Sequence, residues 1–417
     1  MSQLLLHLKK IGELPRDTKL LISIDSVLSL ARGYTQVIEL IYLSILGLNA
    51  AQIGLIVSIS AINPIRILFY SIIADKYGKK KVLAFMNIMG AIHFSTYYVT
   101  RDFLWFFLAT TITGGIVAGN VIEQALLAEK SGDTMRTMAF SVRSFVTTVF
   151  SIIGSSLSGF PEYLQKMYNL DVVESIKPLF IIGIILSLIA TTMNLFIKEE
   201  NRKTKKNSLK TKFISKKSQG FILRFSLSSI IMAVGSGVFF NLVSLWFWLT
   251  YEVKLSEVGY ILAASKIVEA PTFLLGPIIA SRLGLVKAYT VTRLIGMVAF
   301  SFMPFMPTPV LAAIVFAIRN AIMHVGLPLK TSYTMALLNP EERASSASLI
   351  NLPSIVPQAV ASALGGYLME YVSTILPIYI AVAAFSSEAI YYNIIFSKIK
   401  PPEERSNIMS KKTSPIE

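Results

Sequence analysis

Apolar residues recur along the whole chain in long stretches that short polar segments separate. Most stretches approach the length of about 20 residues that a helix needs to cross a bilayer. Strands of a transmembrane barrel would be about ten residues long and would alternate in polarity. The pattern therefore predicts an all-α, polytopic membrane protein with twelve transmembrane helices, near residues 20–46, 52–73, 82–100, 103–127, 138–159, 178–197, 220–250, 257–280, 288–304, 309–337, 345–370 and 375–397.

The composition of the 417 residues supports this interpretation. Hydrophobic residues make up 53% and charged residues 15%, and the mean hydropathy is +0.62. A soluble domain carries about 25% charged residues, so a soluble or disordered protein is excluded. The chain has no cysteine, which excludes disulfides, iron–sulfur clusters and a thiol nucleophile.

The distribution of lysine and arginine predicts the orientation in the membrane. With the N-terminus in the cytoplasm, the cytoplasmic segments hold 27 of the 39 basic residues and the outer loops hold 4. Basic residues concentrate on the cytoplasmic side of membrane proteins, so we expect both termini to be cytoplasmic. The same bias accounts for the net charge of +15 without a nucleic-acid partner.

The most basic segment, residues 198–219, divides the predicted helices into two sets of six. We interpret it as a solvated linker next to anionic lipid headgroups. The domains are then an N-terminal six-helix bundle at 1–197, this cytoplasmic linker, and a C-terminal six-helix bundle at 220–417.

The two halves resemble each other weakly at an offset of about 206 residues. The matches are 52–54 with 257–259, Pro64 with Pro271, 74–78 with 280–284, and Gly159 with Gly366. Glycines and prolines that match at helix ends favour a true repeat, so the two bundles should be pseudo-symmetric. A parallel repeat of six-helix halves is typical of transporters.

Residues 71–83, which read S-I-I-A-D-K-Y-G-K-K-K-V-L, lie between the second and third predicted helices. They resemble the G-x-L-A-D-R-x-G-R-K-x-x-L motif of the major facilitator superfamily, which lies at this place in that family. Ser71 departs from the usual glycine. The segment 125–141 also resembles the family's junction between its fourth and fifth helices. The resemblance covers nearly the whole chain and implies a transporter.

The chemistry of the motif predicts a gate. Gly78 permits a tight turn between antiparallel helices, and Lys76, Lys79 and Lys80 hold the loop in the cytoplasm. The Asp75 carboxylate can accept hydrogen bonds from free N–H groups where another helix begins. The resemblance implies that this is the eleventh helix, near residues 343–345.

Ionisable residues within the predicted spans are costly in a bilayer and therefore indicate function. In the first span, Asp25, Arg32 and Glu39 follow one another at intervals of seven and share one helix face. Neighbours lie about 10 Å apart along the axis. We therefore expect their partners on other helices or in water, not within the same helix.

The tenth span carries Arg319 and Lys330 on one face, with His324 off that face, and Glu123 in the fourth span matches Lys330 by the repeat. Asn241 is a candidate for polar contact in the seventh span. In the family, the first, fourth, seventh and tenth helices line the central cavity. The predicted substrate-binding residues are Arg32, Glu39, Asn241, Arg319, His324 and Lys330.

A carboxylate among apolar side chains can bind and release a proton near neutral pH, so Asp25, Glu39 and Glu123 are the predicted proton-coupling residues.

The other charges in the spans have more ordinary interpretations. Arg224 and Arg293 lie near the cytoplasmic ends and are expected to extend towards the headgroups. Lys266 and Glu269 are three residues apart and could pair. Arg66 and Arg143 could line a cavity or extend to the headgroups. His93 and Glu388 lie in spans that form the outer scaffold in the family, and His93 is expected to be a satisfied structural histidine.

Motifs of other function classes are missing. The sequence has no phosphate-binding G-x-x-x-x-G-K-[ST] loop, no G-x-S-x-G elbow and only three histidines, so neither direct ATP hydrolysis nor an enzyme is expected. A non-transporting membrane receptor is a further class, but charges of both signs on cavity helices argue against it. The arginine that some drug antiporters carry in the fourth helix is replaced here by Thr111.

We therefore interpret the protein as a secondary transporter in the cell membrane, working by the rocking of two halves about a site near the bilayer midplane. Its partners would be a small-molecule substrate, membrane lipid and protons as a coupling ion, with no cofactor, no metal and no nucleic acid, and it would act as a monomer. The small excess of basic residues in the spans favours an anionic or zwitterionic solute held by Arg32 and Arg319. Uncoupled facilitation and drug efflux remain the alternatives.

Overall fold

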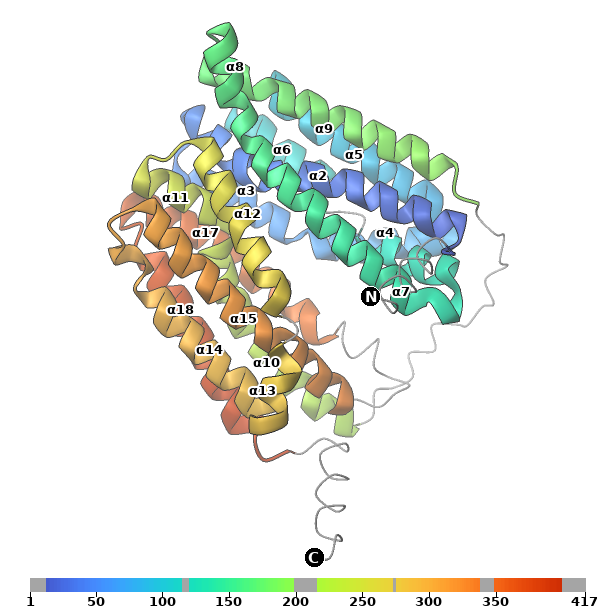
Figure 1. The fold of residues 1–417 in the computed structure, drawn as a ribbon, viewed down its shortest axis with the longest axis vertical. Coiled ribbons are helices and arrows are strands. Elements are labelled where there is room, and N and C mark those ends of the chain that lie inside the picture. The colour runs from blue at the N-terminus through green and yellow to red at the C-terminus, as the bar shows by residue number, and fades with distance from the viewer. Residues whose placement is uncertain (1–12, 115–119, 199–215, 273–274, 338–348, 400–417) are drawn as a thin grey trace, which may run out of the picture. The chain divides into compact units, whose positions relative to one another are not determined.

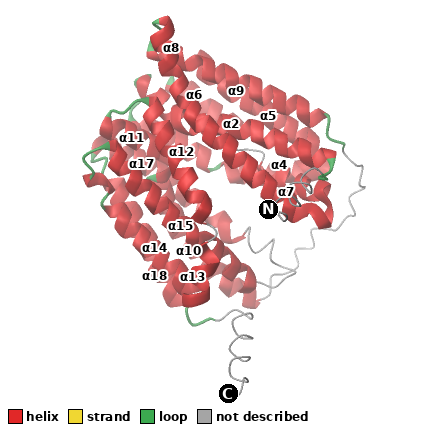
Figure 2. Cartoon of the chain, viewed as in Figure 1, coloured by secondary structure: helices red, strands yellow, loops and turns green. Residues whose placement is uncertain are grey.

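The computed structural model describes residues 13–114, 120–198, 216–272, 275–337 and 349–399. In these residues all regular elements are helices (Figure 2). They divide into two compact units, Met1–Ser208 with Ser244–Ala263, and Leu209–Val243 with Ala264–Glu417. The boundary near residue 208 falls in the predicted linker. The predicted symmetry between residues 1–197 and 220–417 stays a prediction.

Helices of the first unit follow one another with short connections (Figure 1). They are α2 (Arg16–Ile45), α3 (Ala50–Ala61), α4 (Asn63–Tyr77), α5 (Lys79–Val99), α6 (Phe103–Thr113), α7 (Asn120–Ser156), the short η1 (Leu157–Gly159), α8 (Phe160–Tyr168) and α9 (Val172–Leu195). Nearly all of α11 (Val243–Tyr251) and the first half of α12 (Leu255–Thr272) also belong to this unit.

The second unit is helical in the same way. It holds α10 (Lys216–Val238), η2 (Phe240–Leu242), the end of α12, α13 (Leu275–Leu283), α14 (Leu285–Ser301), η3 (Met303–Phe305), α15 (Pro309–Leu337), η5 (Leu352–Ser354), α17 (Ile355–Tyr371) and α18 (Leu376–Phe396).

Nine helical stretches in the described residues are long and apolar enough to cross a membrane. Each overlaps a predicted span, which confirms the all-α, polytopic fold. The remaining three predicted spans are also helical where they are described. They fall short of the same standard because charged residues lower the hydropathy of α2, which carries six of them, three within residues 20–46, while residues 103–127 and 257–280 each contain the end of one helix and the start of another. The count of twelve stays a prediction.

The fourth predicted span differs from the single helix that its hydropathy suggests. Helix α6 ends at Thr113, because Gly114 adopts a left-handed conformation with φ of +80°. The next described helix, α7, begins at Asn120 and continues past Gly132, where a second turn separates two helical parts. The break leaves carbonyl groups at the end of α6 without partners inside their own helix.

Arg66 on α4 supplies a partner for the Thr111 carbonyl, to which its guanidinium donates at 2.6 Å. The guanidinium also reaches the Thr110 carbonyl at 3.3 Å, which accepts the backbone N–H of Gly114 as well. From the sequence, Arg66 could either line a cavity or extend to the headgroups. The structure shows that it caps the end of α6. Pro64 lies in the first turn of α4, next to the break after α3, as expected for a proline in a membrane helix.

Close helix packing brings the charged residues of the first unit together. Helix α2 packs along α7 and also contacts α9 (Figure 1). A Cβ atom on Gly33 would lie 2.3 Å from the Ser151 carbonyl oxygen, and one on Gly154 would lie 2.1 Å from the Leu30 carbonyl oxygen. Only glycine allows this approach, and it places the buried side of α2 against α7.

The turn that follows each copy of the motif uses the same backbone geometry. Gly78 between α4 and α5 has φ of +101°, and Gly284 between α13 and α14 has φ of +78°. Both values lie where side chains other than glycine are strained. The predicted tight turn at Gly78 is confirmed, and its recurrence at the matching position supports the internal repeat.

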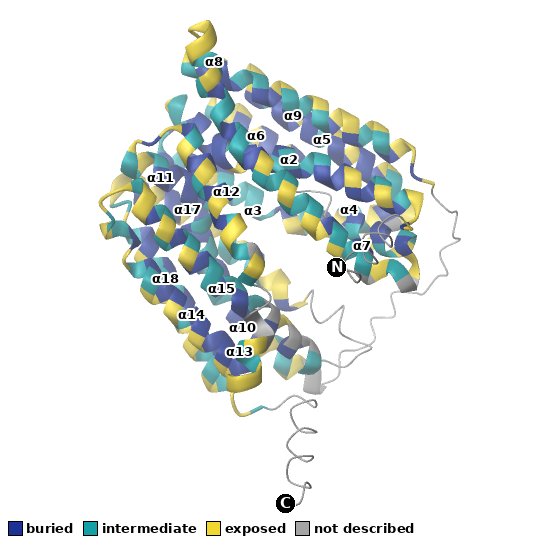
Figure 3. Ribbon diagram, in the orientation of Figure 1, coloured by how far each residue is buried: buried dark blue, intermediate teal, exposed yellow. Residues whose placement is uncertain are grey.

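Many large apolar side chains are exposed on the outer faces of the helices (Figure 3). Examples are Ile72 on α4, Phe145 on α7 and Val298 on α14, each more than 60% exposed. Such a surface is stable in hydrocarbon and not in water, as expected for helices that face lipid.

Candidate functional site

The carboxylate of Asp25 is the centre of a buried charge cluster in the first unit. Asp25 is 1% exposed, accepts a hydrogen bond from Arg32 on the same helix, and forms an ion pair with Arg143 on α7. The Arg143 Nη2 atom lies 2.6 Å from Asp25 Oδ2. A buried carboxylate needs such partners, because an unpaired charge in a low-dielectric interior is very costly.

The pairing of Asp25 with Arg32 corrects the sequence prediction. Their helix positions are seven apart, and we expected partners only on other helices. The axial distance of about 10 Å applies to the backbone, whereas a long arginine side chain can extend along its own helix and reach the shorter aspartate. Arg143, for which the sequence left two alternatives, pairs with Asp25 and does not extend to the headgroups.

Glu123, in the first turn of α7, completes this group. It is 4% exposed, and its Oε1 atom is buried without a hydrogen-bond partner among the described residues. It interacts electrostatically with Asp25, Arg32 and Arg143. We call these four residues the Asp25 cluster. The structure thus brings three predicted residues together and adds Arg143.

Glu39 lies about two turns of α2 beyond Arg32 and makes a separate set of contacts. Its Oε1 atom accepts a hydrogen bond from the Tyr97 hydroxyl at 2.7 Å and lies 3.3 Å from His93 Nε2. The other ring nitrogen of His93 lies 3.2 Å from Thr113 Oγ1. Only Nδ1 of His93 has a hydrogen-bond partner among the described residues, whereas the buried Nε2 faces Glu39, one of the predicted functional carboxylates, at ion-pair distance.

A second buried cluster occupies the second unit and is centred on Glu388 of α18. Glu388 is fully buried, and its Oε1 atom accepts hydrogen bonds from Lys330 at 2.8 Å and Ser228 at 2.6 Å. The Tyr289 hydroxyl donates to Oε2 at 2.7 Å. Arg293 Nε lies 3.4 Å from the same oxygen. We call Glu388, Lys330 and Arg293, with these hydroxyl groups, the Glu388 cluster.

The Glu388 cluster corrects one prediction and qualifies another. Arg293 was expected to extend to the headgroups, but it is 2% exposed and paired. The predicted span 288–304 placed Arg293 near a helix start at the membrane surface, but α14 begins at Leu285 and Arg293 lies at its middle, buried in the core. Lys330 was predicted to bind substrate. Its ammonium is held by Glu388 and Ser228.

Arg319 on α15 lies among aromatic rings. Its guanidinium carbon is 3.7 Å from the centre of the Phe240 ring, and Phe300 and Phe385 lie further out. One terminal nitrogen donates to Asn320 Oδ1 at 2.7 Å. The side chain is thus a buried cation stabilised by cation–π contacts, a role that spacing along the sequence does not reveal.

The other predicted polar contacts of the second unit have partners as well. His324 Nδ1 lies 3.0 Å from Glu269 Oε1, and both side chains are more than one fifth exposed. The amide of Asn241 donates to Ser362 Oγ at 2.9 Å. The side chains of His324 and Glu269 are partly exposed, so a solute could reach this pair.

The lysines of the motif make contacts within the first unit. Lys79 forms an ion pair with Glu129 of α7, and Lys80 donates to the carbonyl groups of Leu195 and Ile197 at the end of α9. Lys76 is exposed, with its ammonium 5.2 Å from the centre of the Tyr77 ring. The side chain of Asp75 and residues 343–345 lie outside what the structure describes.

A comparison with protein families decides the identity of the fold. The model of the Major Facilitator Superfamily matches residues 26–352. The chain belongs to this superfamily. A search of curated proteins gave no match.

Solved structures of transporters have the same fold as this superfamily member. A mutant of the nucleoside transporter NupG aligns with a TM-score of 0.75 at 16% identity, over 91% of this chain and 100% of that one. A bacterial homologue of the human lysosomal transporter Spinster gives 0.71 at 14% identity, over 90% and 95%. A bacterial homologue of the iron transporter ferroportin gives 0.70 at 11% identity, over 90% and 98%.

Family and fold therefore agree on a multi-pass membrane transporter, which is not an enzyme. At these identities the likeness concerns the fold and not the solute.

Proposed function

We propose that this protein is a secondary transporter of a small anionic or zwitterionic organic solute, and that the Asp25 cluster couples a proton to its movement. The observation that carries the proposal is the buried Oε1 atom of Glu123, which has no hydrogen-bond partner among the described residues and lies beside a carboxylate that two arginines already neutralise. A carboxylate left in this state can gain stability by binding a proton.

The charge balance of the Asp25 cluster gives the coupling its direction. With Glu123 ionised, two arginines and two carboxylates sum to zero. With Glu123 protonated, the cluster carries one positive charge and attracts an anionic group more strongly. Arg32 offers the contact, because its side chain is 27% exposed while Asp25 is nearly inaccessible. Proton and anion would therefore bind together and move in the same direction.

Other predicted residues extend this proposal. Glu39 is a second candidate proton carrier, paired with His93. Arg319, His324, Asn241 and Lys330 are the candidate solute contacts of the second unit. Among these, His324 and its partner Glu269 are the most accessible, whereas Arg319 and Lys330 already serve the packing of their own unit.

The mechanism that we propose is alternating access in the cell membrane, with both termini in the cytoplasm and a monomer as the working unit. The family motif supports a role for Asp75 in closing the cytoplasmic side. We expect Asp75→Asn to slow transport by favouring the state open to the cytoplasm. Because the natural chain has no cysteine, single cysteines along the cytoplasmic cavity report the change by labelling. Equal labelling in the parent and the variant would refute this role.

The test of function begins with a thermal-shift screen of the purified protein against metabolites and drugs, since a ligand that prefers the folded state raises its stability. Ligands found in this way are then followed in proteoliposomes with an imposed pH gradient. Glu123→Gln should abolish uphill accumulation and leave exchange intact. Glu39→Gln tests the second candidate in the same assay.

Glu129→Gln is the matched control, because this glutamate is 49% exposed and pairs with Lys79 at the surface. It should accumulate solute like the parent. Accumulation by both Glu123→Gln and Glu39→Gln at the parent level would remove both carboxylates from coupling. If the parent itself shows no response to the pH gradient, the uncoupled facilitator is the correct function. Binding that survives Arg32→Ala and Arg319→Ala unchanged would refute the anion site.

A further inference from the structure

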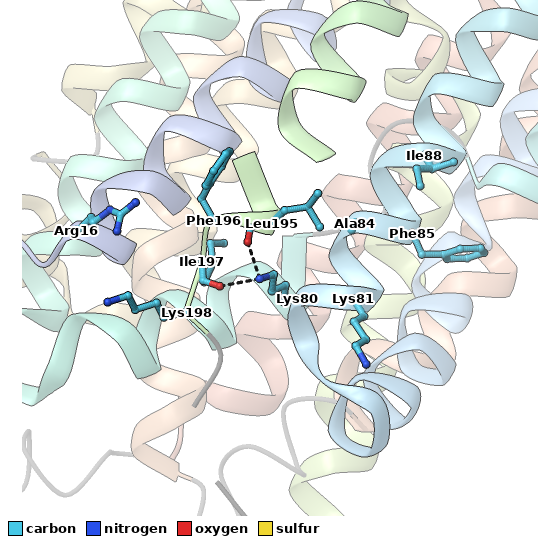
Figure 4. Close-up of a pocket in the computed structure, with 10 residues that line it drawn as sticks. All are labelled: Arg16, Lys80, Lys81, Ala84, Phe85, Ile88, Leu195, Phe196, Ile197 and Lys198. Carbon is cyan, nitrogen blue, oxygen red and sulfur yellow. Dashed lines mark hydrogen bonds between the residues drawn. The ribbon is translucent and has the colours of Figure 1, made fainter. Parts of the chain in front are cut away.

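An open groove of about 1110 Å³ lies at one end of the first unit, where α5 begins and α9 ends. Arg16, at the start of α2, closes one side of it. Figure 4 shows Lys80 in the middle of the groove, with its ammonium between the carbonyl groups of Leu195 and Ile197. In the predicted orientation this is the cytoplasmic end. The groove is separate from the Asp25 cluster, and of the named gate residues it contains only Lys80.

The lining of the groove carries four cations and no acidic side chain. The cations are Arg16, Lys80, Lys81 and Lys198. Lys80 donates to Leu195 and Ile197 at 2.6 and 3.0 Å and so compensates the partial negative charge at the end of α9. Arg16, Lys81 and Lys198 have no carboxylate partner in the described part of the chain and are exposed. They are therefore available to an anion.

Asp17, which follows Arg16 in α2, is already engaged. Asp17 accepts a hydrogen bond from the backbone N–H of Lys198 at 3.1 Å and lies 3.6 Å from the Lys130 ammonium. Asp17 thus holds the chain beyond α9 in place and does not neutralise the side chains of the groove. The local charge remains strongly positive.

Exposed apolar side chains form the rest of the wall. Phe85 and Ile88 on α5 are 46% and 41% exposed, and Leu195 and Phe196 at the end of α9 are 59% and 64% exposed. Both helices are membrane spans by length and composition. Cations at the end of two spans, with exposed apolar groups beside them, combine the chemistry of the headgroup layer with that of the acyl chains.

We infer that this groove binds an anionic phospholipid. The phosphate is attracted by Arg16, Lys81 and Lys198, and the upper part of the acyl chains packs on Phe85, Ile88 and Phe196. A soluble phosphate would use the cations but leave the apolar wall exposed. A zwitterionic lipid would bring an ammonium group to a lining that has no carboxylate to receive it. Both therefore fit less well than an anionic lipid.

Native mass spectrometry of the full-length protein in detergent tests this inference. The probes are phosphatidylglycerol and phosphatidylcholine with identical acyl chains, and inorganic phosphate as a competitor. Because each basic residue near the surface strengthens anionic-lipid binding severalfold, we expect the triple variant Arg16→Gln, Lys81→Gln, Lys198→Gln to bind phosphatidylglycerol at least about tenfold more weakly. Its affinity for phosphatidylcholine should be unchanged.

The matched control removes the same charge elsewhere. Arg224, Arg282 and Lys287 in the second unit are also exposed, and their triple change to glutamine should leave the phosphatidylglycerol affinity as it is. Equal losses in both triple variants would show unspecific attraction and overturn the inference. It would also fail if the parent bound both lipids equally, or if inorganic phosphate at millimolar concentration displaced phosphatidylglycerol.

A second measurement locates the lipid without removing any charge. Phe85→Trp places a fluorophore in the apolar wall, and phosphatidylglycerol brominated on its acyl chains should quench it more strongly than brominated phosphatidylcholine at equal low mole fraction. Trp105, which is exposed in α6, is the internal comparison, in a parent where only that tryptophan remains. The same quenching by both lipids at position 85 would refute the site.

Discussion

Arg143 of α7 and Asp25 of α2 form a buried ion pair, with 2.6 Å between Nη2 and Oδ2. Their helices come close enough because Gly33 and Gly154 leave no side chain between the backbones. The ion pair thus depends on two glycines that carry no charge. It joins two spans that are more than one hundred residues apart in sequence. It also anchors the Asp25 cluster, in which Glu123 is the member whose Oε1 atom has no hydrogen-bond partner among the described residues.

The first prediction concerns the removal of the Asp25 charge. Asp25→Asn leaves the buried Arg143 and the partly exposed Arg32 without the carboxylate that pairs with both, so we expect the free energy of unfolding to fall by about 3–5 kcal/mol. Thermal unfolding of the purified variant in detergent measures the change. Glu129→Gln, which removes an exposed partner of Lys79, should cost at most about 1 kcal/mol. Equal shifts for the two variants would mean that Asp25 is not a buried partner.

The second prediction concerns the turn at Gly78. Its φ of +101° and ψ of +136° are strained for any residue with a Cβ atom, so Gly78→Ala should destabilise the protein by about 1–3 kcal/mol. The control is Gly220→Ala in α10, where an added Cβ would meet no atom within 4 Å. There alanine should stabilise by about 0.5–1 kcal/mol through its helix propensity. Unfolding midpoints that move in the same direction would contradict this account.

Hydropathy alone predicted the helical fold, because a bilayer forces each apolar stretch of sufficient length into a helix. The turn at Gly78 was also predictable, since a glycine followed by lysines between two apolar stretches is typical of a tight turn at the membrane surface. Periodicity placed Asp25 and Arg32 on one face of α2. These parts of the structure depend on local sequence and on the solvent, and both are visible in the sequence.

The partners of the buried charges could not be predicted in the same way. Arg293 was assigned to the headgroups because the predicted span began at residue 288, yet it lies at the middle of α14, which packs against α18 and α15 and turns it towards Glu388. The rotation of a helix about its axis is set by packing with its neighbours, which one sequence does not contain. The break at Gly114 was not predicted for a related reason, because one glycine within an apolar stretch hardly changes the hydropathy of that stretch.

The third prediction concerns the end of α6. Arg66 donates to the Thr111 carbonyl, which has no water to bond with inside a bilayer, and also to the Thr110 carbonyl, which accepts the Gly114 N–H as well. Arg66→Met keeps most of the apolar stem and removes these hydrogen bonds, so we expect a loss of about 1–3 kcal/mol. Arg224→Met is the control, because Arg224 is exposed, and its effect should be within about 0.5 kcal/mol. A loss confined to Arg224→Met would rule out the cap.

The last prediction separates structure from solute binding at Lys330. Glu388→Gln leaves Lys330 and Arg293 facing each other without an anion, so it should cost about 3–5 kcal/mol. Lys330→Met should cost less, because Glu388 keeps Arg293, Tyr289 and Ser228 as partners. The double variant restores the original sum of charges in the cluster, and we expect it to unfold at a higher temperature than Glu388→Gln alone.

A double-mutant cycle on unfolding free energies gives the size of this coupling, which for residues in contact is about 0.5–3 kcal/mol. Additive losses would show that Lys330 and Glu388 do not stabilise each other. The same variants are then tested with the ligand found by thermal shift. If Lys330→Met lowers ligand affinity while the double variant recovers stability but not affinity, Lys330 contacts the solute, as the spacing of charges on α15 predicts. Unchanged affinity in both variants would assign Lys330 to the packing of the second unit.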